Sequence, residues 1–199
     1  MANIEASIVL AGVGGQGTLI AGKLLGILAL KLGLDVKVSE VHGMSQRGGS
    51  VITYVKIGNK VNSPIIEEAT ADFLLSFEEV EAVRWSSLLK KDGVMIVNSQ
   101  KIKSLPVLLG QVQYPSDIES SLKSAVIGNT KVVEFDALSI ANECGTSKAV
   151  NMVMMGALSN YLGVDEKIWK EAIEEAFANK PKVIPTNVSA FDKGAAAAK

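Results

Sequence analysis

A glycine-rich loop near the N-terminus has the residue types and spacing of a loop that binds phosphate. Residues 12–17 read GVGGQG, which matches G-x-G-x-x-G with one additional glycine. Glycines tolerate positive φ and leave no Cβ between backbone N–H groups and an anion, and we expect Gly14 to adopt positive φ. A helix that begins after the loop would add a partial positive charge. Either a bound anion or a tight strand-to-helix turn accounts for such a loop, and its candidate contact residues are Gly12, Gly14, Gly15, Gln16, Gly17 and Thr18.

An acidic residue further along the chain extends the resemblance to a dinucleotide site. Glu40 follows Gly17 by twenty-three residues and ends the next predicted strand. In dinucleotide-binding domains an acid at this point binds the ribose. The Lys-Ser/Thr ending of a mononucleotide phosphate loop does not follow Gly17, which counts against a regulatory nucleotide-binding module.

A second polar loop follows the strand that contains Glu40. Residues 39–50 read SEVHGMSQRGGS and stand where open α/β sheets bind ligands and partners. The imidazole of His42 could act as an acid or base, or could hydrogen-bond within its own loop. Arg47 could bind a phosphate or carboxylate, or pair with Glu40. The candidate ligand- or interface-binding residues here are His42, Gly43, Ser45, Gln46, Arg47, Gly48 and Gly49.

Alternating strands and helices position both loops. Apolar and β-branched runs predict strands at residues 6–11, 36–41, 50–57, 72–77, 94–98 and 131–135, with a weak strand near 111. Helices are predicted at 18–32, 78–89, 140–162, 165–179 and 185–198, and from about 116. This order predicts a single α/β domain over residues 1–199: a three-layer, mostly parallel, open, Rossmann-like sheet with C-terminal helices. Gly58-Asn59 has hairpin turn chemistry and predicts an antiparallel edge hairpin.

Composition excludes several classes of function. The net charge of −1 provides no surplus of Lys and Arg for a nucleic-acid partner. Cys144 is the only cysteine, so this chain alone cannot hold an iron–sulfur cluster, and the single histidine makes a zinc site improbable. The N-terminus lacks a signal-peptide pattern and no apolar run spans a bilayer, so we expect a cytoplasmic protein without a membrane partner.

The two loops together resemble the gamma-type domain of the 2-oxoacid:ferredoxin oxidoreductases. GVGGQG followed by SEVHGMSQRGGS is most similar to the branch that acts on indolepyruvate, although Ser45 replaces an expected alanine. The likeness spans nearly the whole chain. It continues through residues 72–84 (DFLLSFEEVEAVR), 94–98, 151–157 (NMVMMGA), Asn187, Ala190 and Phe191.

The resemblance implies a division of labour between subunits. A large (alpha) subunit would carry thiamine diphosphate and iron–sulfur clusters, while coenzyme A serves as cosubstrate and ferredoxin accepts the electrons. This chain alone would hold no cofactor and would be inactive in isolation. The alternative is a free-standing NAD(P)- or flavin-binding oxidoreductase, which predicts dinucleotide binding that Glu40→Ala weakens.

Overall fold

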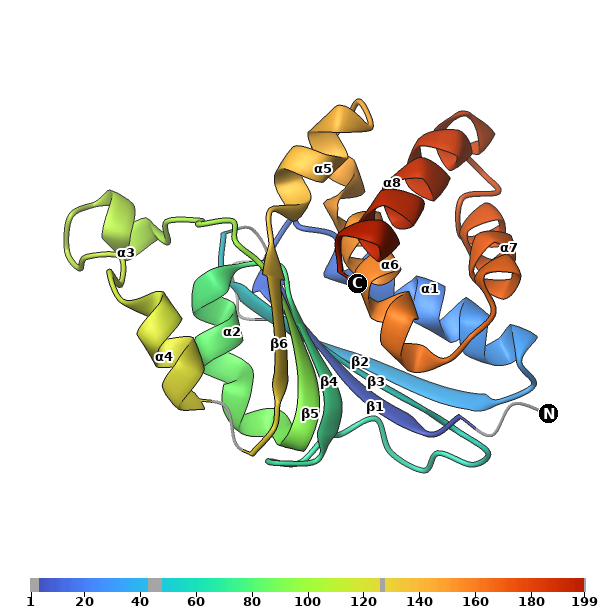
Figure 1. The fold of residues 1–199 in the computed structure, drawn as a ribbon, viewed down its shortest axis with the longest axis horizontal. Helices are drawn as coiled ribbons and strands as arrows, with labels where there is room; N and C mark the ends of the chain where they lie inside the picture. Colours follow the sequence, from blue (N-terminus) through green and yellow to red (C-terminus); the bar gives the residue numbers. More distant parts are fainter. Residues whose placement is uncertain (1–3, 43–47, 126–127, 199) are drawn as a thin grey trace.

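A six-stranded sheet forms the centre of the molecule. The computed structural model describes residues 4–42, 48–125 and 128–198. The strand order is β2-β3-β1-β4-β5-β6 (Figure 1). β1, β4, β5 and β6 are parallel neighbours, which confirms the predicted mostly parallel α/β sheet. The strands are β1 (Ala6–Val13), β2 (Asp35–His42), β3 (Ser50–Gly58), β4 (Ala71–Ser76), β5 (Leu89–Asn98) and β6 (Lys131–Phe135).

The antiparallel hairpin lies at one edge of the sheet, but not at the predicted turn. β3 ends at Gly58 and no strand follows it until β4, so the hairpin predicted at Gly58-Asn59 is wrong. The hairpin consists of β2 and β3, and β3 is antiparallel to β1 as well. The apolar residues of β3, such as Ile52 and Val55, are buried, which suits a strand that lies between two others. The half-polar β2 forms the edge.

Helices cover both faces of the sheet, which makes three layers (Figure 1). α2, α3 and α4 lie on one side, and α1 with α5 to α8 on the other. The helices are α1 (Thr18–Lys31), α2 (Glu79–Trp85), α3 (Leu105–Leu108), α4 (Ile118–Ala125), α5 (Ala137–Glu143), α6 (Val150–Leu162), α7 (Glu166–Ala176) and α8 (Ile184–Ala197), with 3₁₀ turns at 86–88, 147–149 and 181–183.

The predicted helix 78–89 ends at Trp85, β5 begins at Leu89 rather than at residue 94, and two further stretches differ from the prediction. The weak strand near residue 111 is wrong, because the chain there runs as a loop after the short helix α3. The predicted helix 140–162 is two helices, because Gly145 has φ +95° and ends α5. The Thr146 hydroxyl then accepts a hydrogen bond from the Lys148 N–H and starts the next turn.

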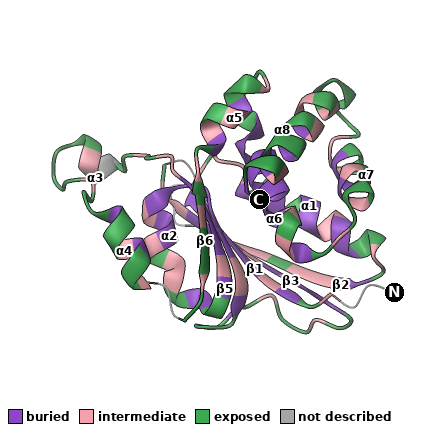
Figure 2. Ribbon diagram, in the orientation of Figure 1, coloured by how far each residue is buried: buried purple, intermediate pink, exposed green. Residues whose placement is uncertain are grey.

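The larger core lies between the sheet and the layer of α1, α6, α7 and α8. Figure 2 shows burial concentrated in the sheet and in α6. Trp169 from α7 and Phe191 from α8 are buried side by side, with ring centroids 5.5 Å apart. This core fixes α1 and α6 against the sheet, and their N-termini border the first glycine loop.

Candidate functional site

The first glycine loop is a tight connection between β1 and α1. Gly15 and Gly17 have φ of +109° and +87°, whereas Gly14 is not among the described glycines with positive φ, so that expectation is wrong. A Cβ on Gly17 would lie 2.7 Å from Nδ2 of Asn151 at the start of α6. Both its backbone conformation and this neighbour therefore require glycine at position 17.

Gln16 fastens the loop to the ends of three strands. Its Oε1 accepts a hydrogen bond from the Val13 N–H (2.8 Å). Its Nε2 donates to the Phe77 carbonyl (2.7 Å) and to Oε1 of Gln100 (3.2 Å). These contacts favour a positioning role for Gln16, while its contact with a ligand stays a prediction.

The second loop lies directly against the first. The Gly14 N–H donates to the Gly49 carbonyl (2.9 Å), and the Gly48 N–H donates to the Gly14 carbonyl (3.3 Å). The structure thus brings Gly48 and Gly49 to Gly14, as expected for two loops at the same end of the sheet. Four further candidates, Gly43, Ser45, Gln46 and Arg47, lie outside the described residues.

Glu40 is separated from the first loop's strand by β3. In register, Glu40 faces Thr53 and Thr53 faces Leu10 of β1, so Glu40 lies two strands away, roughly 10 Å. Its Oε2 accepts hydrogen bonds from the hydroxyls of Thr53 (3.3 Å) and Thr18 (3.5 Å). In a dinucleotide domain the ribose-binding acid ends the strand beside the glycine loop's strand, so this geometry does not favour the dinucleotide alternative.

His42 lies exposed at the end of β2, opposite Val51 of β3. It is the last described residue before the second loop. This position fits either role predicted for it.

A cavity of about 390 Å³ opens beside the first loop. Gly15 and Gly17 line it together with Gln100, Lys148 and Asn151. α1 starts at this cavity without a side-chain cap on its first N–H groups. α6 follows directly on the 3₁₀ turn 147–149, and Oδ1 of Asn151 accepts a hydrogen bond from the Met152 N–H (2.9 Å). The exposed Lys148 adds a positive charge. The uncapped N-terminus of α1 beside an ammonium group makes this cavity suitable for an anion.

Sequence reasoning missed Lys148 and Asn151 as site residues. They lie more than 120 positions after the glycine loop, and only the packing of α6 against α1 brings them there. A local signal was the segment GTSKAVN at residues 145–151, in which a glycine inside the predicted helix 140–162 is followed closely by Lys148.

A second cavity, of about 540 Å³, borders the second loop on the other face of the sheet. Its lining includes Gly48, Gly49, Arg84 and Tyr114. The buried Glu78 caps α2 by accepting hydrogen bonds from the N–H groups of Val80 (2.7 Å) and Glu81 (3.1 Å).

Glu78 also fixes the wall of this cavity. Its other oxygen accepts hydrogen bonds from the Ile102 N–H (3.1 Å) and the Tyr114 hydroxyl. Burial, and then Glu78 itself, raise the pKa of Tyr114, so the phenol stays protonated and keeps donating this bond. None of these residues was singled out from sequence as a site residue.

Comparison with known proteins assigns the chain to a family. Residues 7–197 match the family described as pyruvate ferredoxin/flavodoxin oxidoreductase. The chain belongs to this family. It is 44% identical to indolepyruvate oxidoreductase subunit IorB of Pyrococcus horikoshii, over 98% of this chain and 96% of that protein.

Two solved structures of oxidoreductases share the fold. The gamma subunit of a keto/oxoacid ferredoxin oxidoreductase from Geobacter sulfurreducens has a TM-score of 0.70 and 24% identity, covering 97% of this chain and 98% of its own. The 2-oxoglutarate:ferredoxin oxidoreductase of Magnetococcus marinus, solved with coenzyme A bound, has a TM-score of 0.74 and 20% identity. That match covers 99% of this chain and 31% of the Magnetococcus chain. The fold therefore occurs both as a separate subunit and within a longer chain.

The side chains that commonly bind metals are scattered over the described part of this family member. Within residues 4–42, 48–125 and 128–198, no three His, Cys, Asp or Glu side chains gather to hold a metal. Cys144, the chain's only cysteine, is half-buried at the end of α5, with its sulfur 3.7 Å from the Ser189 hydroxyl. Among the described helices, none is long and apolar enough to cross a membrane.

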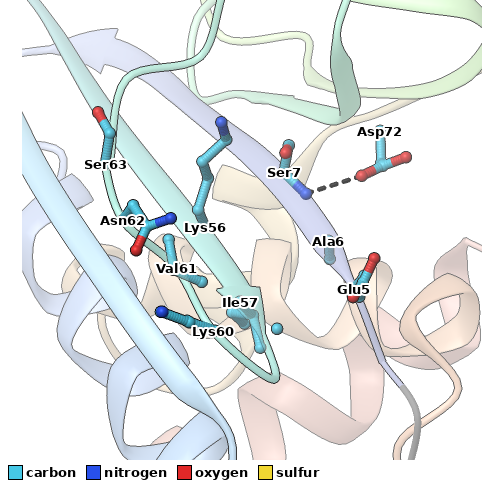
Figure 3. A pocket seen from close by; sticks show the side chains of 11 residues that line it. Glu5, Ala6, Ser7, Lys56, Ile57, Lys60, Val61, Asn62, Ser63 and Asp72 are labelled. Atoms are coloured by element: carbon cyan, nitrogen blue, oxygen red, sulfur yellow. Dashed lines mark hydrogen bonds between the residues drawn. The ribbon is translucent and has the colours of Figure 1, made fainter.

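A cavity of about 590 Å³ at the opposite end of β1 is a weaker candidate site (Figure 3). Lys56, Lys60 and Asp72 line it, and Asp72 accepts a hydrogen bond from the Ser7 N–H (2.7 Å). It lies at the amino end of β1, about 20 Å along the strand from the glycine loops. Open α/β sheets bind their ligands at the carboxyl ends, which favours the two loops.

Proposed function

We propose that this chain is the small, non-autonomous subunit of an indolepyruvate (arylpyruvate):ferredoxin oxidoreductase that acts in the cytoplasm. The large subunit carries thiamine diphosphate and the iron–sulfur clusters. The complex converts the 2-oxo acid and coenzyme A into acyl-CoA and CO₂ and passes the electrons to ferredoxin. The observation that carries this proposal is the match to subunit IorB over nearly the full length of both chains.

Within the complex, the first glycine loop binds the diphosphate of coenzyme A. The support is the cavity beside Gly15 and Gly17, where α1 begins without a side-chain cap and Lys148 is exposed. Backbone N–H groups and an ammonium group suit a diphosphate. The Magnetococcus enzyme, whose chain contains this fold, was solved with coenzyme A bound, which makes coenzyme A a reasonable ligand to test here.

The second loop, with His42, Gly48 and Gly49, completes the crevice and faces the large subunit. The Gly14 N–H donates a hydrogen bond to the Gly49 carbonyl, so a ligand or partner that moves one loop should also move the other. The small subunit thus presents coenzyme A to the partner that holds the reacting cofactor.

The test is reconstitution with the large subunit. Indolepyruvate- and coenzyme A-dependent ferredoxin reduction is measured for the wild type and for Lys148→Ala. We expect the variant to raise the KM for coenzyme A roughly tenfold with kcat nearly unchanged, because a charge-assisted hydrogen bond contributes about 1.5 kcal/mol.

The matched control is Lys182→Ala, another exposed lysine in a 3₁₀ turn, which is not among the residues that line the cavity. Equal KM values for the two variants would remove Lys148 from the coenzyme A site. A chain that purifies alone with a bound nicotinamide or flavin would instead support the free-standing oxidoreductase.

A further inference from the structure

A buried carboxylate lies under the second glycine loop. Glu81 of α2 is 4% exposed. Its Oε2 accepts hydrogen bonds from the Ser50 hydroxyl and from the Trp85 indole N–H (3.1 Å), and its Oε1 accepts one from Nε of Arg84 (3.1 Å). Ser50 directly follows Gly49 in the chain. One carboxylate therefore joins α2 to the residue at which the second loop ends.

The chemistry of Glu81 makes this joint stiff. A buried carboxylate is costly unless donors satisfy it, and removing one of its donors leaves that cost uncompensated. Ser50, Arg84 and Trp85 together supply a hydroxyl, a guanidinium and an indole donor to its two oxygens. The position of Ser50 relative to α2 is therefore fixed by a charge that cannot readily find other partners.

The connection continues from Ser50 to the first loop. Gly49 accepts a hydrogen bond from the Gly14 N–H, and Gly14 accepts one from the Gly48 N–H. The backbone of Glu81 is fixed as well, because its N–H donates a hydrogen bond to the Glu78 carboxylate (3.1 Å). A displacement of Ser50 would consequently move Gly49 and alter the backbone at Gly14.

Arg84 gives this connection a second effect on the site. Its side chain is 53% exposed and lines the cavity bordered by Gly48 and Gly49. Glu81 binds Arg84 through Nε alone among the bonds described, so the carboxylate orients a guanidinium that faces this second cavity.

We propose that Glu81 is a positioning residue for the glycine-loop crevice. It holds Ser50, and thereby Gly48 and Gly49, at the distance from Gly14 that coenzyme A binding at the first loop needs, and it orients Arg84 in the second cavity. This proposal rests on the proposed function, because it assumes that the first loop binds coenzyme A.

The experiment compares Glu81→Gln with Glu79→Gln in the complex with the large subunit. Glu79 is a matched control, since it lies on the same helix and is 6% exposed. Its carboxylate faces Lys101 (3.6 Å) rather than the second loop, and burial raises its pKa. We expect Glu81→Gln to raise the KM for coenzyme A at least tenfold with kcat within twofold, and Glu79→Gln to leave both unchanged.

A further readout follows the loops directly. Hydrogen exchange at the Gly14 and Gly48 amides in the complex should be at least tenfold faster in Glu81→Gln than in Glu79→Gln. Glu81→Asp, which keeps the charge, should restore part of the protection. If the two glutamine variants lower the melting temperature alike and leave KM and exchange alike, Glu81 is only structural and the proposal fails. A wild-type complex without coenzyme A-dependent activity would overturn the proposed function, while the exchange rates would still decide whether Glu81 holds the loops.

Discussion

Single residues of the first loop divide the work between holding the fold and facing the crevice. A glutamine amide has one acceptor oxygen and two N–H donors. Gln16 uses the oxygen for Val13 and the amino group for Phe77 and Gln100. In the proposed coenzyme A site, Gln16 would therefore fix the loop and leave the binding of the anion to backbone N–H groups of the loop.

The two glycines with positive φ in this loop separate backbone strain from crowding. Gly17→Ala should lower the free energy of unfolding by about 2–3 kcal/mol, because it combines a left-handed alanine with a clash against Asn151. Gly15→Ala should cost only about 1 kcal/mol, since a Cβ at Gly15 has no neighbour within 4 Å. Urea denaturation of both variants measures the difference. Equal losses would show that Asn151 yields and that backbone strain alone requires glycine at position 17.

At the scale of elements, glycines also set how closely helices pack. A Cβ on Gly22 of α1 would lie 3.2 Å from Thr53, so α1 approaches β3 closely there, whereas Gly26 faces open space. α6 and α8 approach more closely still. A Cβ on Gly156 would lie 2.0 Å from the Phe191 carbonyl, and one on Gly194 would lie 2.0 Å from the Val153 carbonyl. The close packing of α6 on α8, which helps to position the start of α6 at the cavity, thus depends on one glycine in each helix.

Replacing one of these glycines should separate the two helices. We expect Gly194→Ala to destabilise the protein by about 3 kcal/mol or more, because rigid backbone leaves no room for a methyl group. Gly26→Ala should instead stabilise it by about 0.5–1 kcal/mol, since alanine favours a helix and meets no atom within 4 Å. Thermal unfolding of the two variants distinguishes packing from helix propensity. A neutral Gly194→Ala would mean that α8 shifts freely on α6.

Elements with a strong local pattern could be predicted from sequence, and their pairing could not. The β-branched alternation of residues 50–57 predicted β3 within one residue of its observed end, because side-chain periodicity is local. Its place between β2 and β1 depends on non-local pairing, for example of Ile52 with Val41 and Ala11. α3 is only four residues long and too short to show a helical period. Lys148 escaped notice for the same non-local reason.

At the scale of the whole molecule, the two joined loops separate two cavities of different character. The cavity beside α1 and α6 has helix N-termini and Lys148. The cavity beside α2 is walled by apolar side chains such as Val80, Ile102 and Val107, with Arg84 among them. An anionic ligand in the first cavity and a partner protein over the second could therefore bind at the same end of the sheet.

Substitution of Arg47 tests whether this end of the sheet is a subunit interface. It directly precedes Gly48, which is bonded to the first loop, and it follows the β2 strand that ends at His42. We expect Arg47→Ala to weaken assembly with the large subunit, or to lower the activity of the complex, at least tenfold, because a guanidinium that binds a partner or ligand anion contributes about 1.5–3 kcal/mol. The isolated small subunit should keep its melting temperature within about 2 °C, because this hypothesis assigns Arg47 to a partner or ligand and not to the fold.

Lys37→Ala controls for the loss of one charge on the same hairpin. Lys37 pairs with Asp35 (2.7 Å) near the far end of β2, away from both loops, so this variant should assemble and react like the wild type. Analytical ultracentrifugation and ferredoxin reduction on all three proteins separate assembly from turnover. An Arg47→Ala subunit that unfolds would show that Arg47 supports the hairpin itself, and the interface would then have to be sought away from the second loop.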